Sequence, residues 1–276
     1  NLKLLYKATP EVPPFSQLTW LRPVITPLGE HQIAGGRVHF DWLDVVMLSQ
    51  NSGYVVARMH FDEFMASVDD RNLASTALDK IMASRPDFAG LEMSRSHLMG
   101  VLNVTPDSFS DGGVNVGPFK GIAAGKAMWA QGASIIDIGG ESTRPGAEKV
   151  SRNQELARIL PPIAGLSRDN VRVSVDTRYA AVMTRATAAG ATIINDVGGL
   201  QGDGVVAAVA ASKAPVVIMH MKGTPKTMQQ DPHYEFAPIE IYEFLKMRIE
   251  AAISAGIPAS KIAVDPGFGF GKNVVH

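Results

Sequence analysis

Short apolar runs alternate with helix-like stretches from about residue 98 onward. Six runs are rich in β-branched residues and nearly continuous, as strands buried on both faces are. The predicted strands are Leu98–Leu102, Ser134–Ile138, Val171–Val175, Ala191–Ile194, Pro215–Met219 and Lys261–Val264. Helical spacing lies between them, in places ending at a glycine, which is a C-cap signal. Examples are Ile122–Gln131 before Gly132, Ala180–Ala188 before Gly190 and Ile239–Ala255 before Gly256. These units predict a parallel sheet, either doubly wound or closed.

Each predicted strand ends in, or runs into, a polar or otherwise special residue. The positions are Asn103, Asp137, Asp176, Asn195, Met219 and Asp265. In an open sheet the chemistry concentrates at one switch point, whereas every strand end of a barrel contributes. The even spread therefore favours an α/β fold of the (β/α)8 TIM-barrel type. Closure needs eight strands, so we expect an incomplete barrel of about six βα units.

Residues 1–95 lack this alternation of short apolar runs and helical stretches. Prolines crowd the beginning, two mixed segments follow at Arg37–Leu48 and Gly53–Val68, and Leu73–Ala83 has helical spacing. We expect a small α+β extension of unknown role at 1–95, followed by a barrel domain at 96–276.

Composition narrows the function classes. The 276 residues include 26 Lys and Arg against 27 Asp and Glu, which argues against nucleic acid or an anionic membrane as the main partner. There is no cysteine, so disulfide scaffolds, thiolate zinc sites and a cysteine nucleophile are excluded, and a reducing cytoplasm fits. No apolar run reaches membrane-spanning length.

Four strand-end residues share one chemistry, the acceptance of hydrogen bonds or cations. They are Asp137, Asp176, Asn195 and Asp265. Buried carboxylates are costly unless paired, so such a set needs a ligand rich in N–H donors, a cation, or both. The edge of a 2-amino-4-oxo pterin presents adjacent N–H donors to a carboxylate. The alternative for any single residue is pairing with Arg144, Arg178 or Lys272, although this is harder to sustain for the whole set.

Other candidates lie in the loops. Asn103 offers a neutral oxygen for a hard cation that also takes phosphate oxygens. Arg144 offers a planar fork of donors for phosphate or carboxylate, unless it pairs with Glu141 or Glu148. His220 and His233 could bind a metal but have no partner at i+4 spacing, so we take them as structural.

The segment Asp265–Lys272 resembles a phosphate-binding loop only superficially. Pro266 stands where that motif needs glycine, and Asn273 stands where it needs Ser or Thr. A backbone that closely approaches a flat ligand fits better, with Phe270 available for stacking. Gly269 and Lys272 belong to the same candidate binding segment.

Six segments together resemble dihydropteroate synthase, in the family's order and at compatible spacings. They are Asn103–Gly113 (NVTPDSFSDGG), Ile136–Gly146 (IDIGGESTRPG), Ser174–Thr177 (SVDT), Ile193–Asp196 (IIND), Met219–Met228 (MHMKGTPKTM) and Asp265–Lys272 (DPGFGFGK). The resemblance covers the chain from about Leu98 to its last residue. It implies a homodimeric Mg²⁺-dependent transferase, the sulfonamide target, that joins 6-hydroxymethyl-7,8-dihydropterin diphosphate to 4-aminobenzoate and releases diphosphate.

The resemblance also implies a role for each matching residue. Asn103 would bind Mg²⁺ and diphosphate, and Thr143 and Arg144 would close over the diphosphate and aminobenzoate. The pterin would be held by Asp176, Asn195 and Asp265, with Met219 against its ring and Asp137 deeper in the pocket. Phe270 would lie near the aminobenzoate ring, and we include Gly269 and Lys272 among the substrate-binding residues.

The family also has further C-terminal strands that this chain does not contain. We therefore expect a fragment with impaired activity, poorly folded as a soluble monomer because open barrel edges expose apolar strands. Two other readings stay open. One is a pterin-dependent methyltransferase with a corrinoid partner, against which the SFSDGG and ESTRPG segments speak. The other is a non-catalytic paralogue that acts by interaction, with residues 1–95 as the candidate surface.

Overall fold

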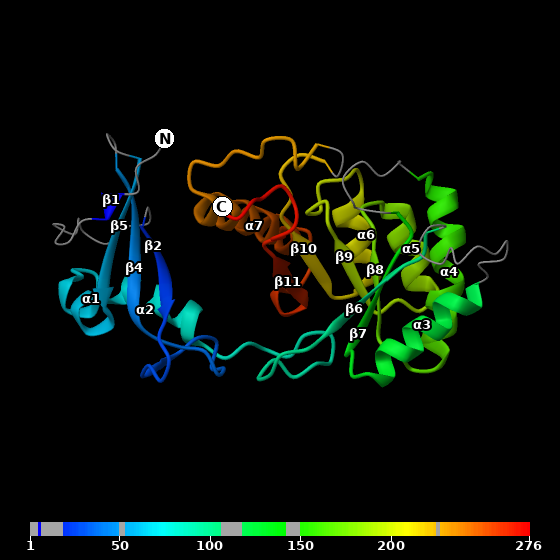
Figure 1. Ribbon diagram of the computed structural model, residues 1–276, viewed down its shortest axis with the longest axis horizontal. Helices are drawn as coiled ribbons and strands as arrows, with labels where there is room; N and C mark the ends of the chain where they lie inside the picture. Colours follow the sequence, from blue (N-terminus) through cyan, green and yellow to red (C-terminus); the bar gives the residue numbers. More distant parts are fainter. Residues whose placement is uncertain (1–4, 7–18, 50–52, 106–117, 142–149, 225–226) are drawn as a thin grey trace. The chain divides into compact units, whose positions relative to one another are not determined.

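The computed structural model describes residues 5–6, 19–49, 53–105, 118–141, 150–224 and 227–276. The chain forms two compact units (Figure 1). The first comprises Asn1–Asp87 and Glu92–Arg95, and the second comprises Phe88–Leu91 and Ser96–His276. Each unit has its own hydrophobic core.

The first unit is a sheet with two helices. Its strands are β1 (Leu5–Tyr6), β2 (Thr19–Ile25), β3 (His31–Gln32), β4 (His39–Ser49) and β5 (Gly53–His60), and its helices are α1 (Phe61–Ser67) and α2 (Arg71–Met82). The strand order is β1-β5-β4-β2, with β3 paired to β4. Alternate residues of β4, such as Leu43 and Val45, share a core with Phe64 of α1 and Leu78 of α2.

A buried carboxylate on β4 lies between arginines of the two neighbouring strands of this first sheet. Asp44 is fully buried and lies opposite Arg22 and Arg58 in the strand register. Arg58 Nε donates to Asp44 Oδ1 at 2.8 Å, and Arg22 binds the other carboxylate oxygen. Burial alone would raise the pKa of Asp44, but the two guanidiniums bring it below its ordinary value. The ion pairs of Asp44 with Arg22 and Arg58 therefore stabilise this unit when Asp44 is ionised.

The second unit is a six-stranded parallel sheet with helices between its strands (Figure 1). The strands are β6 (Met99–Asn103), β7 (Ile135–Gly139), β8 (Val173–Asp176), β9 (Ile193–Asp196), β10 (Val216–Met219) and β11 (Ile262–Asp265), and they pair in chain order. The helices are α3 (Pro118–Ala130), α4 (Arg152–Arg168), α5 (Ala180–Ala188), α6 (Val205–Ser212) and α7 (Ala237–Ser254). This confirms the predicted fold class, with six strands and five helices between them in the described residues.

The glycines past three helices adopt left-handed backbone conformations. The φ angles are 104° at Gly132, 114° at Gly190 and 89° at Gly256. Glycine adopts this region without the steric cost that a Cβ atom imposes, and it follows each helix as a C-cap. The predicted helix ends at α3, α5 and α7 therefore have a direct backbone cause.

The strands of the second unit bury one face against the helices. Ile136 and Ile138 of β7 lie in the large core with Val173 and Val175 of β8. Because side chains alternate across a strand, the residues between them point to the opposite, inner face. The inner-face positions at the carboxyl ends are those predicted for the site: Asn103, Asp137, Asp176, Asn195, Met219 and Asp265.

The amino end of the inner face is apolar. Phe88 and Leu91 form a small turn closed by two backbone hydrogen bonds, and Leu91 packs with Ile135 and Ile193 near the strand starts. The polar positions therefore lie only toward the opposite end of the strands, where barrel chemistry is found. Among the described residues, no helix is both long and apolar enough to cross a membrane.

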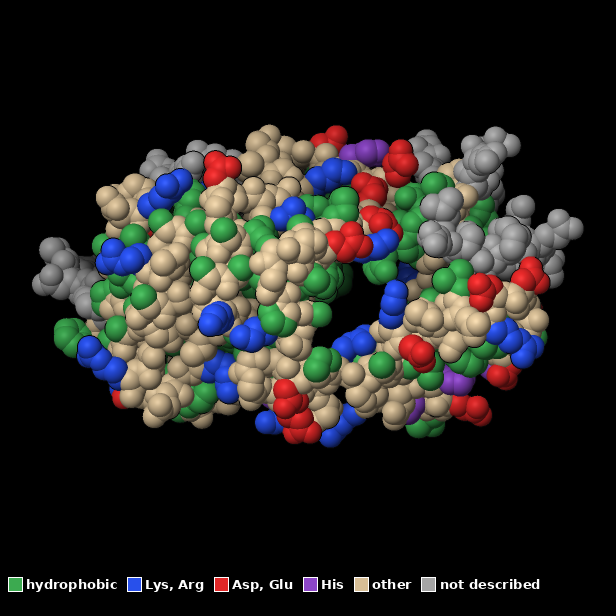
Figure 2. Space-filling view, turned by 180° about the vertical axis from the view of Figure 1, so that it is seen from behind, with side chains coloured by type: hydrophobic (Ala, Val, Ile, Leu, Met, Phe, Trp, Pro, Cys, Tyr) green, Lys and Arg blue, Asp and Glu red, His purple; other side chains and the backbone are tan. Residues whose placement is uncertain are grey.

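Charged side chains of both signs lie on the face of the molecule seen in Figure 2. Figure 2 shows both blue and red side chains on the visible face. This distribution agrees with the balanced composition.

Candidate active site

The strand register brings the polar residues together in layers. Asn103 lies beside Gly139, Gly139 beside Asp176, and Asp176 beside Asn195 across four neighbouring strands. Asp137 lies one layer nearer the strand starts, beside Ser174. On the other side, Met219 pairs with Asp265 across β10 and β11. The six positions thus form one rim, with Asp137 deepest.

The deepest part of the rim has unused hydrogen-bonding atoms. Asn195 Nδ2 donates to Asp137 Oδ2 at 2.9 Å. Asp137 Oδ1, Asn195 Oδ1 and Ser174 Oγ are buried without a hydrogen-bond partner among the described residues. Burial raises the pKa of Asp137, and the nearby Ser174 hydroxyl and the Asn195 amide offset this only in part. Buried polar atoms left in this state call for a ligand or ordered water.

Asp176 lies at the centre of this layer. Burial, followed by the negative charge of Asp137, raises its pKa well above the ordinary value. A Cβ atom on Gly139 would lie 3.3 Å from Asp176 Oδ2 and 3.4 Å from Asn103 Oδ1. The two oxygens therefore border the same small space, which glycine leaves open. Such a pair suits a hydrogen-bond donor or a hard cation.

The nearby cations are engaged elsewhere. Arg178 Nη2 binds both carboxylate oxygens of Glu141, at 3.0 and 2.9 Å. Lys272 Nζ binds the ring of His220 and carbonyl groups of its own loop. Neither forms an ion pair with Asp137 or Asp176 within the described residues. For Asp137 and Asp176, pairing with Arg178 or Lys272 is therefore absent among the described residues, and Arg144, the third partner considered, lies outside them.

Two other strand-end carboxylates are held by backbone amides. Asp196 accepts from Gly198 N at 2.7 Å and Leu200 N at 2.8 Å, and burial raises its pKa to about 6. It lies on the helix side and caps the turn after β9. Asp265 accepts from Gly267 N at 2.7 Å through Oδ1. That contact orients the carboxylate, and no hydrogen bond to a described residue is seen for Oδ2.

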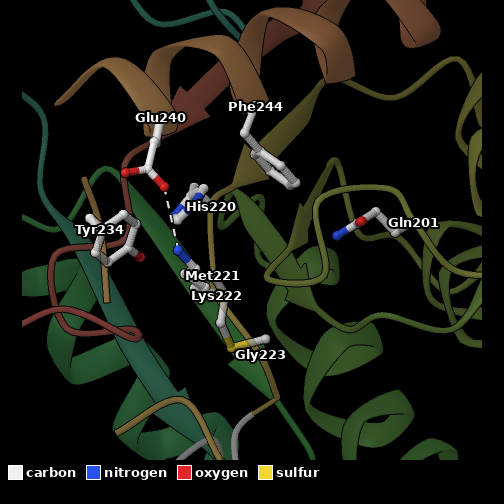
Figure 3. A pocket seen from close by; sticks show the side chains of 8 residues that line it. All are labelled: Gln201, His220, Met221, Lys222, Gly223, Tyr234, Glu240 and Phe244. Atoms are coloured by element: carbon white, nitrogen blue, oxygen red, sulfur yellow. Dashed lines mark hydrogen bonds and ion pairs between the residues drawn. The ribbon is translucent and has the colours of Figure 1, made fainter. Parts of the chain in front are cut away.

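A cavity of about 360 Å³ lies beside the end of β10. Its lining residues come from the loops after β9 and β10 and from α7: Gln201, His220, Met221, Lys222, Gly223, Tyr234, Glu240 and Phe244. Figure 3 shows Glu240 and Phe244 extending from α7 and Gln201 across the space. Lys222 Nζ lies 3.4 Å from Glu240 Oε2 and 4.3 Å from the Tyr234 ring centroid. The cavity's cation is therefore already paired.

Several contributors had no individual role assigned to them from the sequence. Gly139 shapes the space before Asp176, and Ser174 faces Asp137 on the neighbouring strand. Glu155 of α4 is buried, and burial raises its pKa. Alternation within the strands could have identified Ser174, two residues before Asp176. The burial of Glu155 depends on tertiary packing and leaves no local signal.

Some predicted residues lie outside the described part of the chain. These are Thr143, Arg144 and most of the segment Asn103–Gly113, of which positions 106–113 are not described. Of the loop after β11, Phe270 is partly buried, and the Gly269 carbonyl accepts from Gln229 Nε2 at 2.9 Å. His220 is buried in hydrogen-bonded packing, as expected for a structural histidine. The described residues contain no group of three or more His, Cys, Asp or Glu suited to a metal ion.

Comparison with known proteins identifies the family. The model of the pterin binding enzyme family matches residues 99–276. Dihydropteroate synthase of Escherichia coli (strain K12) is 45% identical over 187 residues, which are 67% of this chain and 66% of that protein. The chain thus spans about two thirds of the length of that relative.

Solved structures agree. Yersinia pestis dihydropteroate synthase with a sulfonamide drug complex has a TM-score of 0.64 and 48% identity, covering 67% of this chain and 68% of that one. Burkholderia cenocepacia dihydropteroate synthase complexed with 7,8-dihydropteroate has a TM-score of 0.60 and 42% identity, covering 67% and 62%. The chain therefore belongs to the pterin binding enzyme family and, within it, to the dihydropteroate synthases.

Proposed function

We propose that this protein is a transferase that forms 7,8-dihydropteroate from 6-hydroxymethyl-7,8-dihydropterin diphosphate and 4-aminobenzoate. The observation that carries this proposal is the set of buried oxygens on Asp137 and Asn195, beside Asp176, that have no hydrogen-bond partner in the described part of the chain. A related structure binds 7,8-dihydropteroate, and that product contains both substrate moieties.

The pterin is proposed to lie on the inner face over β7 to β11. Its ring N–H and amino donors would meet Asp176, Asn195 and Asp265, with Asp137 fixed behind them by the Asn195 amide. Met219 is almost fully buried beside Asp265 and would supply an apolar contact to the ring. A ligand that donates hydrogen bonds here removes the cost of burying these carboxylates unpaired.

Asn103 is the proposed protein ligand of Mg²⁺. Its Oδ1 and Asp176 Oδ2 border the space in front of Gly139, and oxygen donors of this kind suit a hard cation. Mg²⁺ is commonly held by few protein groups plus substrate phosphates and water, so a large acidic cluster is unnecessary. When bound, the ion would neutralise charge on the departing diphosphate.

The rest of the reaction requires positioning rather than a protein nucleophile. The bond from the pterin methylene carbon to the diphosphate oxygen breaks, the amine nitrogen bonds to that carbon, and the amine loses a proton. We propose that Thr143 and Arg144 serve the diphosphate and aminobenzoate. Phe270 and the Gly269 backbone would border the aminobenzoate ring. Holding amine and carbon together accounts for much of the barrier reduction in such a reaction.

The proposal also covers the cellular location and the oligomeric state of the protein. We place the enzyme in the cytoplasm, because the chain has no cysteine and its substrates are soluble metabolites. We also propose a homodimer. Tyr242, Met247 and Ile253 of α7 are exposed apolar residues that a second subunit could cover, and analytical ultracentrifugation would measure this.

The direct test incubates the protein with the pterin diphosphate, labelled 4-aminobenzoate and Mg²⁺. Chromatography should show labelled dihydropteroate and one diphosphate per product, and neither should form with Asp176→Asn. Binding of each substrate is measured in parallel by calorimetry. A folded protein that binds neither the pterin nor aminobenzoate would contradict the proposal. Methyl transfer from a methylated pterin without dihydropteroate formation would favour the methyltransferase alternative.

A further inference from the structure

Lys272 is a buried lysine whose ammonium group is fully engaged. Its relative exposure is 9%, and Nζ lies 2.8 Å from the Gly267 carbonyl oxygen and 2.9 Å from that of Phe270. The His220 ring Nδ1 and carbonyl oxygen lie at 3.0 and 3.3 Å. An ammonium has three N–H donors, and these four acceptors use all of them. No donor remains for a substrate.

These contacts join two rim segments. Lys272, Gly267 and Phe270 belong to the loop after β11, whereas His220 follows β10 directly. The His220 backbone N–H also donates to the Asp265 carbonyl at 2.9 Å. Lys272 therefore fastens the loop that follows Asp265 and carries Phe270 to the end of the strand that carries Met219.

The loop has little freedom to find another arrangement. Gly267 has a φ of 65°, and a Cβ atom there would clash with the His220 carbonyl oxygen. Its N–H orients Asp265, while its carbonyl receives both Lys272 Nζ and the Phe270 N–H. Tyr234 Oη adds a hydrogen bond of 2.9 Å to the Gly271 carbonyl. One short segment thus links the Lys272 contact to the Asp265 carboxylate.

His220 has a specific state in this arrangement. Because Lys272 is a donor, Nδ1 must be the unprotonated acceptor, and the ring proton lies on Nε2. The ring is buried, with its centroid 4.9 Å from that of Phe244 in an edge-to-face contact. Burial, assisted by the Lys272 charge, lowers the pKa of His220 to about 4, which keeps the ring neutral.

We propose that Lys272 and His220 are positioning residues, which set substrate affinity by fixing Asp265 and Phe270 and not by touching the substrates. This inference rests on the proposed function, because the pterin and aminobenzoate are the ligands those two residues would meet. It also changes the expected role of Lys272 from substrate contact to loop organisation.

The test measures ligand affinity and the histidine ring state together. Lys272→Met keeps the chain length and removes the donors. We expect at least a 10-fold rise in the dissociation constant of the pterin diphosphate and in the aminobenzoate KM, with a smaller change in kcat. Lys261→Met is the matched control: Lys261 is partly buried directly before β11, at the opposite end of the strand from the rim, and its Nζ donates to the Lys213 carbonyl at 2.6 Å, so affinities should stay unchanged.

A second pair of variants covers the case in which Lys272→Met fails to fold. His220→Gln keeps a side-chain acceptor, whereas His220→Leu removes it. We expect His220→Gln to retain affinity within about 3-fold of the wild type and His220→Leu to lose at least 10-fold. In the wild type, nitrogen NMR of the ring should show the Nε2–H form at neutral pH.

The outcomes separate the inference from the function. A folded Lys272→Met or His220→Leu variant with wild-type affinity would overturn the inference, as would an Nδ1–H form of His220. If the wild type bound no pterin although His220 showed the expected ring state, the proposed function would fail, and the positioning role with it. The Lys272–His220 contact itself would then still stand.

Discussion

Gly139 offers a clean perturbation of the rim. A methyl group added at Gly139 would lie 3.3 Å from Asp176 Oδ2 and 3.4 Å from Asn103 Oδ1. Both distances are tight but not clashing, so side chains need to move only by a few tenths of an ångström. Gly139 has an ordinary negative φ, and alanine in a strand loses less chain entropy than glycine. We expect Gly139→Ala to change the free energy of unfolding by less than about 1 kcal/mol.

The effect on the ligand should be much larger. The methyl group would occupy space that a donor or cation needs to reach both Asp176 and Asn103. Losing one hydrogen bond to a charged group costs about 1.5–3 kcal/mol, which corresponds to roughly a 10- to 150-fold weaker affinity. Gly139→Ala should therefore weaken ligand binding while changing the free energy of unfolding little.

Two measurements test this. Urea unfolding gives the stability, and calorimetry gives the dissociation constant of the pterin diphosphate with Mg²⁺. Gly121→Ala in α3 is the control, since its Cβ would make an ordinary 3.6 Å contact with Pro162 of α4. If Gly139→Ala is stable and binds the substrate as tightly as the wild type, the space before Asp176 is not the ligand site.

Three further predictions concern charge. Asp176→Asn should abolish pterin binding yet raise the free energy of unfolding by about 1–2 kcal/mol at pH 7, because burial and nearby carboxylates oppose ionisation there; urea unfolding and calorimetry measure both. The free energy of unfolding should fall by up to about 3 kcal/mol as the pH falls from about 6.5 to 4, because the unfolded chain protonates His220 at a higher pH than the folded one. Urea unfolding at several pH values measures this, and a folded His220→Gln variant should lose the pH dependence. An unchanged pH dependence in that variant would contradict the prediction. Chelating Mg²⁺ should weaken the binding of the pterin diphosphate at least 10-fold but leave the binding of the diphosphate-free pterin unchanged. Calorimetry on Asn103→Ala should show no effect of Mg²⁺ on either ligand.

Much of the second unit was predictable because its strands are buried on both faces. Observed strand starts differ from the predicted ones by up to two residues. At β8, for example, Val171 N bonds to the Leu166 carbonyl and completes the turn after α4 before the strand begins. In the first unit, Gly53–Val68 contains both β5 and α1, and no periodicity separated them.

The rim residues were predictable because they end strands and share one face. Their depth was not, because it depends on register between strands distant in sequence, which places Asp137 below Asp176 and Asn195. The hydrogen bonds of Lys272 could not be predicted from the sequence for a similar reason. Its partner His220 is 52 residues away, and only the folded loop brings them within 3.0 Å.

The most direct test of the central claim compares two ligands on one protein. The claim is that the buried oxygens of the rim recognise the N–H donors of a pterin. The dissociation constant of 6-hydroxymethyl-7,8-dihydropterin should be at least about 30-fold lower than that of its analogue lacking the 2-amino group, since removing a donor leaves a buried acceptor unpaired. Equal affinity for the two ligands would contradict the account.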